Sequence, residues 1–314
     1  MIERIAKLLI SSSFIFLTTL GTGAQTAMFQ QDVSWSPDGK YLAFTGLHDI
    51  DQKTNTLKAD LYVIRVDGSD VRKISGDDKN EFYTSWAKRR IAFSSEIPGS
   101  KRTDIFYANP DGTGIQQITN GPGQNTAPAF SSDGKRIAFV STREGGKYQL
   151  YTMMADGSKV TRLTKDNDAV GYFNPQWSSD GKRIVCYTEK GDGKDQVWIM
   201  NSDGSNKTLL TAGVGHNIYP GWSPDGKKII FSSSKRDSES NGSFIDGSFL
   251  YTMNADGSGL YKTRQHQKLF RPVLSRRKKD RIRFGSVSVD GDLHRECGRL
   301  GCDEDHEIVP RRKP

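Results

Sequence analysis

The stretch WSPDGKYLAF, residues Trp35–Phe44, recurs along the chain and decides the fold. Each copy joins an aromatic anchor, a short turn and an alternating apolar segment. The other copies are WAKRRIAF from Trp86, FSSDGKRIAF from Phe130, WSSDGKRIVCY from Trp177 and WSPDGKKIIF from Trp222. The anchors are 44 to 51 residues apart, a period that indicates a repeat architecture with several short strands per unit.

Two further motifs follow each anchor. The second is an apolar segment that ends in Asp-Gly, as in DLYVIRVDGS (from Asp60), DIFYANPDGT (Asp104), QLYTMMADGS (Gln149), QVWIMNSDGS (Gln196) and FLYTMNADGS (Phe249). The third is VRKIS, IQQIT, VTRLT, KTLLT and, more weakly, LYKTR. Asp-Gly is typical of tight turns, because Asp accepts from the backbone two residues on and Gly supplies a positive φ. Each unit is therefore expected to hold four antiparallel strands.

A four-stranded sheet this short cannot bury both of its faces alone, and stacking such sheets radially solves the problem. The sequence predicts an all-β fold, a β-propeller of four-stranded antiparallel blades, with five clear blades over residues 25–270. The tryptophans recur at one blade position, so we interpret them as structural packing: Trp35, Trp86, Trp177 and Trp222. Cys186 stands where other blades have Phe and is expected to be a small buried residue.

These motifs resemble the TolB-like propeller repeat, a WD-like blade also found in the N-terminal propeller of prolyl-oligopeptidase-type peptidases. The resemblance covers about Val33 to Arg264. It implies the propeller fold, which binding proteins, gating domains and enzymes share. TolB itself carries an α/β domain ahead of its propeller. About ten residues separate the predicted leader from Trp35, so we expect that domain to be absent.

The amino terminus has the pattern of a signal peptide. Arg4 and Lys7 precede a short apolar stretch, Leu8–Leu20, and small residues follow it up to Ala24. A membrane anchor would need about 20 apolar residues. We expect residues 1–24 to be removed at the Ala24–Gln25 bond, which leaves a periplasmic or secreted chain without a membrane span.

Residues 271–314 form an irregular basic tail in which the repeat is lost. LSRRKKDRIRF (from Leu274) admits codons that read PDGKRIAF one nucleotide on, and GDLHRECGRLGCDEDHE (from Gly291) admits codons that read EIYIVNADGSDVTRIT. We expect a degraded, frameshifted sixth blade that starts near Val273–Ser275, with Cys297 and Cys302 as accidents of the shift. Two alternatives remain: a native basic tail that binds an anionic partner, and a truncated product that fails to fold because an open ring exposes strand edges.

The net charge of +8 does not indicate nucleic-acid binding. Residues 271–314 hold 12 Lys and Arg against 8 Asp and Glu, and residues 25–270 keep only +3, spread evenly. A nucleic-acid-binding surface needs a basic stripe with interleaved aromatics, and this body has none. We therefore expect no nucleic-acid partner.

Evidence for an enzyme is thin in this sequence. The body has three histidines, His48, His216 and His266, without a His-Glu-x-x-His pairing, and it lacks Gly-x-Ser-x-Gly. We expect no catalytic residue, no metal and no cofactor. Asp166-Asn167-Asp168 could form a weak cation site or a polar loop.

The irregular connections indicate where recognition takes place. With four strands per blade, the uniform turns share one face, and the variable connections share the other, which we call the loop face. Variable loops on a rigid scaffold usually carry recognition. The candidate exposed side chains there are Tyr83, Arg143, Tyr172, Phe173, His216, Tyr219, Lys235 and Arg236. The alternative for each aromatic side chain is that it packs beneath its own loop.

We therefore expect a non-catalytic exported propeller that binds a protein or a cell-envelope component through its loop face. The alternative is the propeller part of a carbohydrate-active or peptidase-type enzyme whose catalytic part is absent.

Overall fold

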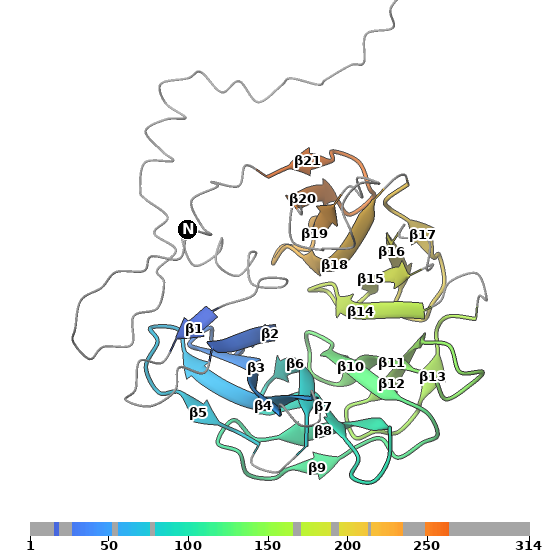
Figure 1. The fold of residues 1–314 in the computed structure, drawn as a ribbon. Helices are drawn as coiled ribbons and strands as arrows, with labels where there is room; N and C mark the ends of the chain where they lie inside the picture. The colour runs from blue at the N-terminus through green and yellow to red at the C-terminus, as the bar shows by residue number, and fades with distance from the viewer. Residues whose placement is uncertain are drawn as a thin grey trace, which may run out of the picture.

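The computed structural model describes residues 16–18, 27–51, 56–75, 79–165, 171–189, 195–212, 215–234 and 249–263. These residues form strands, turns and bends, with no helix among them. Five antiparallel sheets follow one another along the chain and stand around a common centre (Figure 1). The predicted all-β propeller with five blades is confirmed.

The strands of each blade run in chain order from the ring centre to its rim (Figure 1). Blade 1 contains β1 (Phe16–Thr18), β2 (Ala27–Trp35), β3 (Tyr41–Asp51), β4 (Thr56–Arg65) and β5 (Arg72–Lys73). Blade 2 contains β6 (Glu81–Ala87), β7 (Arg90–Glu96), β8 (Thr103–Ala108) and β9 (Gln116–Gln117). Blade 3 contains β10 (Asn125–Phe130), β11 (Arg136–Ser141), β12 (Gln149–Met154) and β13 (Thr161–Arg162). Blade 4 contains β14 (Gly171–Trp177), β15 (Arg183–Glu189), β16 (Gln196–Asn201) and β17 (Thr208–Leu209). Blade 5 contains β18 (His216–Trp222), β19 (Lys228–Ser234), β20 (Phe249–Asn254) and β21 (Tyr261–Lys262).

Strand β1 is an additional strand of blade 1 and lies within the predicted leader. It pairs antiparallel with the start of β2. Cleavage at the Ala24–Gln25 bond would remove β1 and leave four strands, as in the other blades.

The turns between the first two main strands of a blade are built as predicted. Asp38 Oδ1 accepts hydrogen bonds from Ser36 Oγ at 2.6 Å and from the Lys40 N–H at 3.1 Å. Both bonds lower the pKa of the Asp38 carboxyl, and the bond from Ser36 has the larger effect. Gly39 completes the turn with a φ of 70°. The same bonds recur at Ser131–Asp133, Ser178–Asp180 and Ser223–Asp225.

The outermost strand of each blade is shorter than predicted, because a side-chain hydroxyl takes over from the backbone ladder. In blade 3, Thr164 Oγ1 accepts from the Leu150 N–H at 2.9 Å, and the Leu163 N–H donates to the Leu150 carbonyl at 2.8 Å. The equivalent hydroxyls of blades 1, 2 and 4 belong to Ser75, Thr119 and Thr211. The third motif therefore closes blades 1 to 4 by its terminal hydroxyl, whereas Thr263 Oγ1 of blade 5 donates to the Leu250 carbonyl at 2.8 Å.

The apolar core is divided into clusters between neighbouring blades. Blades 3 and 4 share one cluster, in which Cys186 is fully buried, as predicted. In this cluster Trp177 Nε1 donates to the Ala129 carbonyl of blade 3 at 3.0 Å. The Arg136 guanidinium covers the Trp177 ring at 4.4 Å and donates to the Gly181 carbonyl at 2.9 Å. The anchor tryptophan therefore packs and bonds between blades.

Candidate functional site

The innermost strand of each blade contains a bulge three residues before its anchor. The pairing register shifts there, and one residue other than glycine adopts a positive φ. These residues are Asp32 (56°), Tyr83 (57°), Ala127 (51°), Asn174 (49°) and Tyr219 (53°). This conformation costs about 1–3 kcal/mol, and a bulge re-aims the side chain that it carries. Each blade therefore presents one re-aimed side chain on the strand nearest the ring centre.

The bulges correct the expectation that the candidate aromatic residues lie in loops. Tyr83 lies within β6, Phe173 within β14 and Tyr219 within β18. These strands begin before the positions that the sequence predicts. The bulge breaks the alternation of apolar and polar residues, so the sequence pattern hides the continuation of the strand.

Four aromatic rings form a continuous row over blades 3, 4 and 5, which we call the aromatic row. The ring centroids are 5.3 Å apart for Tyr148 and Phe173, and 5.6 Å apart for Phe173 and Tyr187. Tyr187 meets Tyr219 edge-on at 5.6 Å. These distances are those of favourable aromatic pairs. Tyr219 ends the row with 39% of its surface exposed, and Tyr83, at the equivalent position of blade 2, is 39% exposed too.

Carboxylates lie beside these two exposed tyrosines. Asp32 Oδ2 accepts a hydrogen bond from the Tyr83 N–H at 3.3 Å. Burial raises the pKa of Asp32 to about 6 against the effect of this bond. Burial, followed by the charge of Asp32, raises the pKa of both Tyr83 and Tyr219, and Glu189 adds to this effect on both. These acidic and phenolic groups lie on the first or second strands of blades 1, 2, 4 and 5.

His216 and Asp195 form a close pair at the junction of blades 4 and 5. Their Nδ1 and Oδ2 atoms are 2.6 Å apart, and both side chains are 12% exposed. The Asn217 N–H donates to the Asp195 carbonyl at 2.9 Å. Burial, followed by the charge of Asp195, raises the pKa of Glu189, and His216 opposes the shift. The pair ties the start of β18 to the connection before β16.

The expected exposure of Tyr172 is wrong, because its side chain is only 1% exposed and belongs to the core between blades 3 and 4. Its phenol oxygen accepts a bond from Lys207 Nζ at 2.8 Å, and the same ammonium lies 5.4 Å from the ring centroid. Phe173, the next residue, belongs to the aromatic row on the other side of the strand. Of this adjacent pair, therefore, only Phe173 belongs to the candidate site.

Arg143 is held in a network of side chains of blade 3. Its Nη2 donates to Asn125 Oδ1 at 2.7 Å and its Nε donates to Ser141 Oγ at 3.1 Å. The guanidinium lies 5.2 Å from each of the Phe139 and Tyr151 ring centroids. Burial lowers the pKa of Arg143. These contacts give the residue a packing role in this structure.

Replacing Arg143 by Ala is expected to lower the free energy of unfolding by about 1–3 kcal/mol, because the buried Asn125 loses a charged donor. Urea unfolding measures this effect. Arg65→Ala is the control, since Arg65 makes an exposed ion pair with Asp67 at 3.5 Å, which contributes about 0–1 kcal/mol. Equal stability of the two variants would contradict the packing role.

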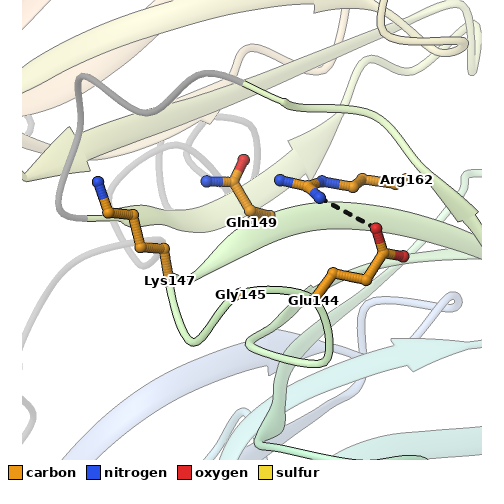
Figure 2. A pocket seen from close by; sticks show the side chains of 5 residues that line it. All are labelled: Glu144, Gly145, Lys147, Gln149 and Arg162. Atoms are coloured by element: carbon orange, nitrogen blue, oxygen red, sulfur yellow. Dashed lines mark hydrogen bonds and ion pairs between the residues drawn. The ribbon is translucent and has the colours of Figure 1, made fainter.

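A pocket of about 590 Å³ opens on the loop side of blade 3 (Figure 2). Glu144, Gly145, Lys147, Gln149 and Arg162 line it. Arg162 Nη1 pairs with Glu144 Oε2 at 3.0 Å. The Gln149 amide oxygen accepts from Thr164 Oγ1 at 2.6 Å. These polar groups already hold blade 3 together, so the pocket is a weaker candidate than the ring centre.

Several predictions lie outside the described residues: Lys235, Arg236, the possible cation site Asp166–Asp168, most of the predicted leader 1–24, and the tail 271–314 with its predicted sixth blade. Within the described ranges, no cluster of three or more His, Cys, Asp or Glu side chains is arranged to hold a metal ion. The same part of the chain contains no helix long and apolar enough to cross a membrane.

The fold is a five-bladed β-propeller, and its described candidate site consists of tyrosine and carboxylate side chains on the inner strands of the blades. The chain belongs to the TolB beta propeller domain family, whose sequence model matches residues 88–271. Over 81 residues it is 40% identical to the Tol-Pal system protein TolB of Desulfosudis oleivorans. The matched segment covers 26% of this chain and 16% of that protein. Over another 81-residue match it is 30% identical to dipeptidyl-peptidase 5 of Porphyromonas endodontalis, covering 24% of this chain and 12% of the peptidase.

Among solved structures, TolB from Acinetobacter baumannii has a TM-score of 0.58 at 20% identity, covering 78% of this chain and 61% of that one. This likeness concerns the fold. The chain spans less than half the length of the curated relatives that it matches.

Proposed function

We propose that this protein is a non-catalytic exported propeller that binds a protein or another component of the cell envelope through its loop face. The observation that carries the proposal is the pair of half-exposed tyrosines, Tyr83 and Tyr219, held on strained bulges at the ring centre. Tyrosine is enriched among the residues that dominate binding energy at protein interfaces. The match to a protein of the Tol-Pal system supports a partner in the envelope.

The location belongs to the same proposal. Removal of residues 1–24 would place the mature chain in the periplasm or outside the cell, without a membrane span. Nucleic acid is not among the proposed partners, because the body of the chain carries only a small, evenly spread positive charge.

The test is capture of envelope proteins by the purified mature chain. Replacing both Tyr83 and Tyr219 by Ala is expected to reduce capture of a bound protein by at least tenfold, as loss of a central aromatic contact does. The matched control is Ile115→Ala, since Ile115 is 50% exposed and lies just after the turn between β8 and β9, on the face of the uniform turns. Capture that survives the double tyrosine variant but is lost with Ile115→Ala would place binding on the other face.

The second candidate function is a propeller that serves a peptidase or a carbohydrate-active enzyme. The match to dipeptidyl-peptidase 5 favours it. Peptide and glycan substrates assayed with the wild-type chain and with His216→Ala separate the two functions. Turnover that depends on His216 would replace the binding proposal.

A further inference from the structure

The pocket of blade 3 lies at a place that blades 1, 2 and 5 fill with a pair of side chains. The pair consists of the first residue of the second motif and the middle residue of the third motif. The middle residue is paired with the residue two positions after the first, and side chains in this diagonal relation can reach each other. In blade 5, Lys262 Nζ lies 3.2 Å from the Phe249 ring centroid. In blade 3 the two residues are Gln149 and Arg162, and the pocket lies against both (Figure 2).

Blades 1 and 2 have a buried carboxylate at this place. In blade 1, Asp60 is 4% exposed, and its Oδ2 lies 2.6 Å from Lys73 Nζ. In blade 2, Asp104 is fully buried, and its Oδ2 accepts from Arg102 Nη2 at 2.8 Å and from Gln117 Nε2 at 3.0 Å. A buried carboxylate needs such partners. Each of these two is held by the third motif, and that of blade 2 also by a cation two residues before it.

Blade 3 keeps cations at the flanking positions and lacks the carboxylate. Lys147 precedes Gln149 by two residues, as Arg102 precedes Asp104 in blade 2. Arg162 is the middle residue of the third motif. Gln149 is 1% exposed, and Figure 2 shows its side chain between those of Lys147 and Arg162. A neutral amide thus stands where the first two blades place a negative charge.

The amide oxygen of Gln149 is committed to the outermost strand. Thr164 Oγ1 accepts from the Leu150 N–H at 2.9 Å, so its own proton is donated to Gln149 Oε1 at 2.6 Å. In blade 2, Asp104 Oδ1 accepts from Thr119 Oγ1 at 2.9 Å in the same way. The Gln149 oxygen therefore corresponds to Asp104 Oδ1. The oxygen that blade 3 lacks is the counterpart of Asp104 Oδ2, which accepts from the flanking side chains.

The carboxylate that lines the pocket does not replace this oxygen. Glu144 Oε2 lies 3.0 Å from Arg162 Nη1, but the Glu144 side chain is 57% exposed, and exposed ion pairs contribute little. Arg162 Nε donates to the Thr164 carbonyl at 2.6 Å, and within the described ranges Arg162 Nη2 makes no hydrogen bond. The pocket volume of about 590 Å³ is typical of small-molecule sites. Its lining side chains are polar, which favours a hydrophilic ligand.

We propose that the blade 3 pocket binds the carboxylate of a small hydrophilic organic acid. The ligand carboxylate takes the place of the missing oxygen between Lys147 and Arg162, where charge-assisted hydrogen bonds hold it. Glu144, at the exposed side of the pocket, accepts from a hydroxyl of the same ligand. This inference goes beyond the proposed function, because the pocket is separate from Tyr83 and Tyr219 and does not require the envelope partner.

The experiment measures binding of gluconate to the mature chain by saturation-transfer NMR, with the uncharged gluconamide as control. We expect gluconate alone to bind. Gln149→Glu returns the carboxylate that blades 1 and 2 have, and it is expected to weaken gluconate at least tenfold, because the cations then have a partner within the chain. The matched control is Gln196→Glu at the equivalent position of blade 4, where the third motif has the uncharged Leu209. It is expected to leave gluconate binding unchanged.

The melting temperature of each variant is recorded as well. Gln149→Glu is expected to keep or raise it, because the new carboxylate lies between two cations, whereas Gln196→Glu is expected to lower it. If Gln149→Glu unfolds, Lys147→Gln keeps the test valid, since Lys147 is exposed; it is expected to weaken gluconate about threefold. Equal binding of gluconate and gluconamide would overturn the proposal, as would wild-type affinity in both Gln149→Glu and Lys147→Gln.

Two further outcomes concern the source of the carboxylate. Asp166 and Asp168 follow Thr164 in the sequence. Gluconate that binds only after both are changed to Asn would show that the chain supplies the carboxylate itself, and this would overturn the proposal. A blocked Gly-Glu-Gly peptide that binds more tightly than gluconate would overturn the small-molecule assignment in favour of an acidic side chain. Envelope capture by Gln149→Glu is expected to equal that of the wild type, which separates this site from the proposed function.

Discussion

A synthetic sixth blade, appended after Phe270, is expected to raise the melting temperature by about 10 °C or more. The blade carries the two motifs recovered from the tail, on the connection lengths of blade 4. In a repeat protein, stability is approximately the sum of the units and their interfaces. A sixth blade would add two interfaces, and each buried large apolar side chain contributes about 1.5–3 kcal/mol. For a chain of this size, 1 kcal/mol shifts the melting temperature by about 2–4 °C.

Blade 1 has an apolar cluster on the face where this neighbour would stand. Four core clusters each combine two adjacent blades. Among the described residues, the fifth cluster draws only on blade 1 and contains the buried Leu42, Phe44 and Ile64, with Trp35 packed against them. Ala43 and Val63, which alternate with these residues, face blade 2. The fifth cluster therefore lies on the face of blade 1 that is turned away from blade 2.

Calorimetry on the chain with and without the added blade measures this effect. The matched control is the same blade with the apolar residues of its second strand replaced by Ser, which adds length without a core. The chain without the added blade is also expected to aggregate at lower concentration, because open strand edges pair with other chains. A melting temperature that stays the same or falls on addition of the apolar blade would contradict the sixth-blade hypothesis.

The blades could be predicted because each depends on local chemistry. The Ser-x-Asp-Gly turn at Ser36 is specified within a few residues, and the alternation in Arg136–Val140 defines a strand with two faces. Both signals recur with every blade, so one copy supports the others. The Ser or Thr that ends the third motif recurs just as regularly in the sequence. Its hydrogen bond to a backbone N–H of the preceding strand could not be predicted, because that bond forms only when the two strands lie side by side.

The site was predicted less well because it depends on contacts between blades. Tyr83 and Tyr219 were among the candidate residues, but the bulge that re-aims them leaves no periodic signal. Asp32 and Glu189 were missed, although Asp32 shares with both tyrosines the position three residues before the anchor. Tyr172 shows the opposite error. The bulge at Asn174 decides which face of the strand Tyr172 and Phe173 each point to, so the sequence does not indicate which of the two rings is buried.

Replacing the anchor tryptophans by Phe is expected to divide them into two classes. Trp177 and Trp222 each donate from Nε1 to a carbonyl of the preceding blade, Ala129 at 3.0 Å and Gln176 at 3.1 Å. Trp177→Phe and Trp222→Phe should each lower the free energy of unfolding by about 1–3 kcal/mol, because a buried carbonyl loses its donor. Trp35 Nε1 and Trp86 Nε1 are buried without a partner, so the same substitution there should cost less than 1 kcal/mol. Urea unfolding of the four variants measures the difference, and equal losses at all four positions would contradict it.

The stability cost of Trp35→Phe is expected to rise when a sixth blade is added to the ring. Trp177 and Trp222 both donate to the residue that precedes the anchor of the previous blade. Trp86 does not follow this pattern although blade 1 precedes it, but Trp35, if it behaves as Trp177 and Trp222 do, would find its acceptor just before the anchor of a sixth blade. Trp35→Phe should therefore cost about 1–2 kcal/mol more in the chain with the added blade than in the chain without it, while the cost of Trp177→Phe stays the same. A double-mutant cycle isolates this coupling from the general gain in stability. If the sixth blade raised stability without any coupling to Trp35, it would be packing somewhere other than against blade 1.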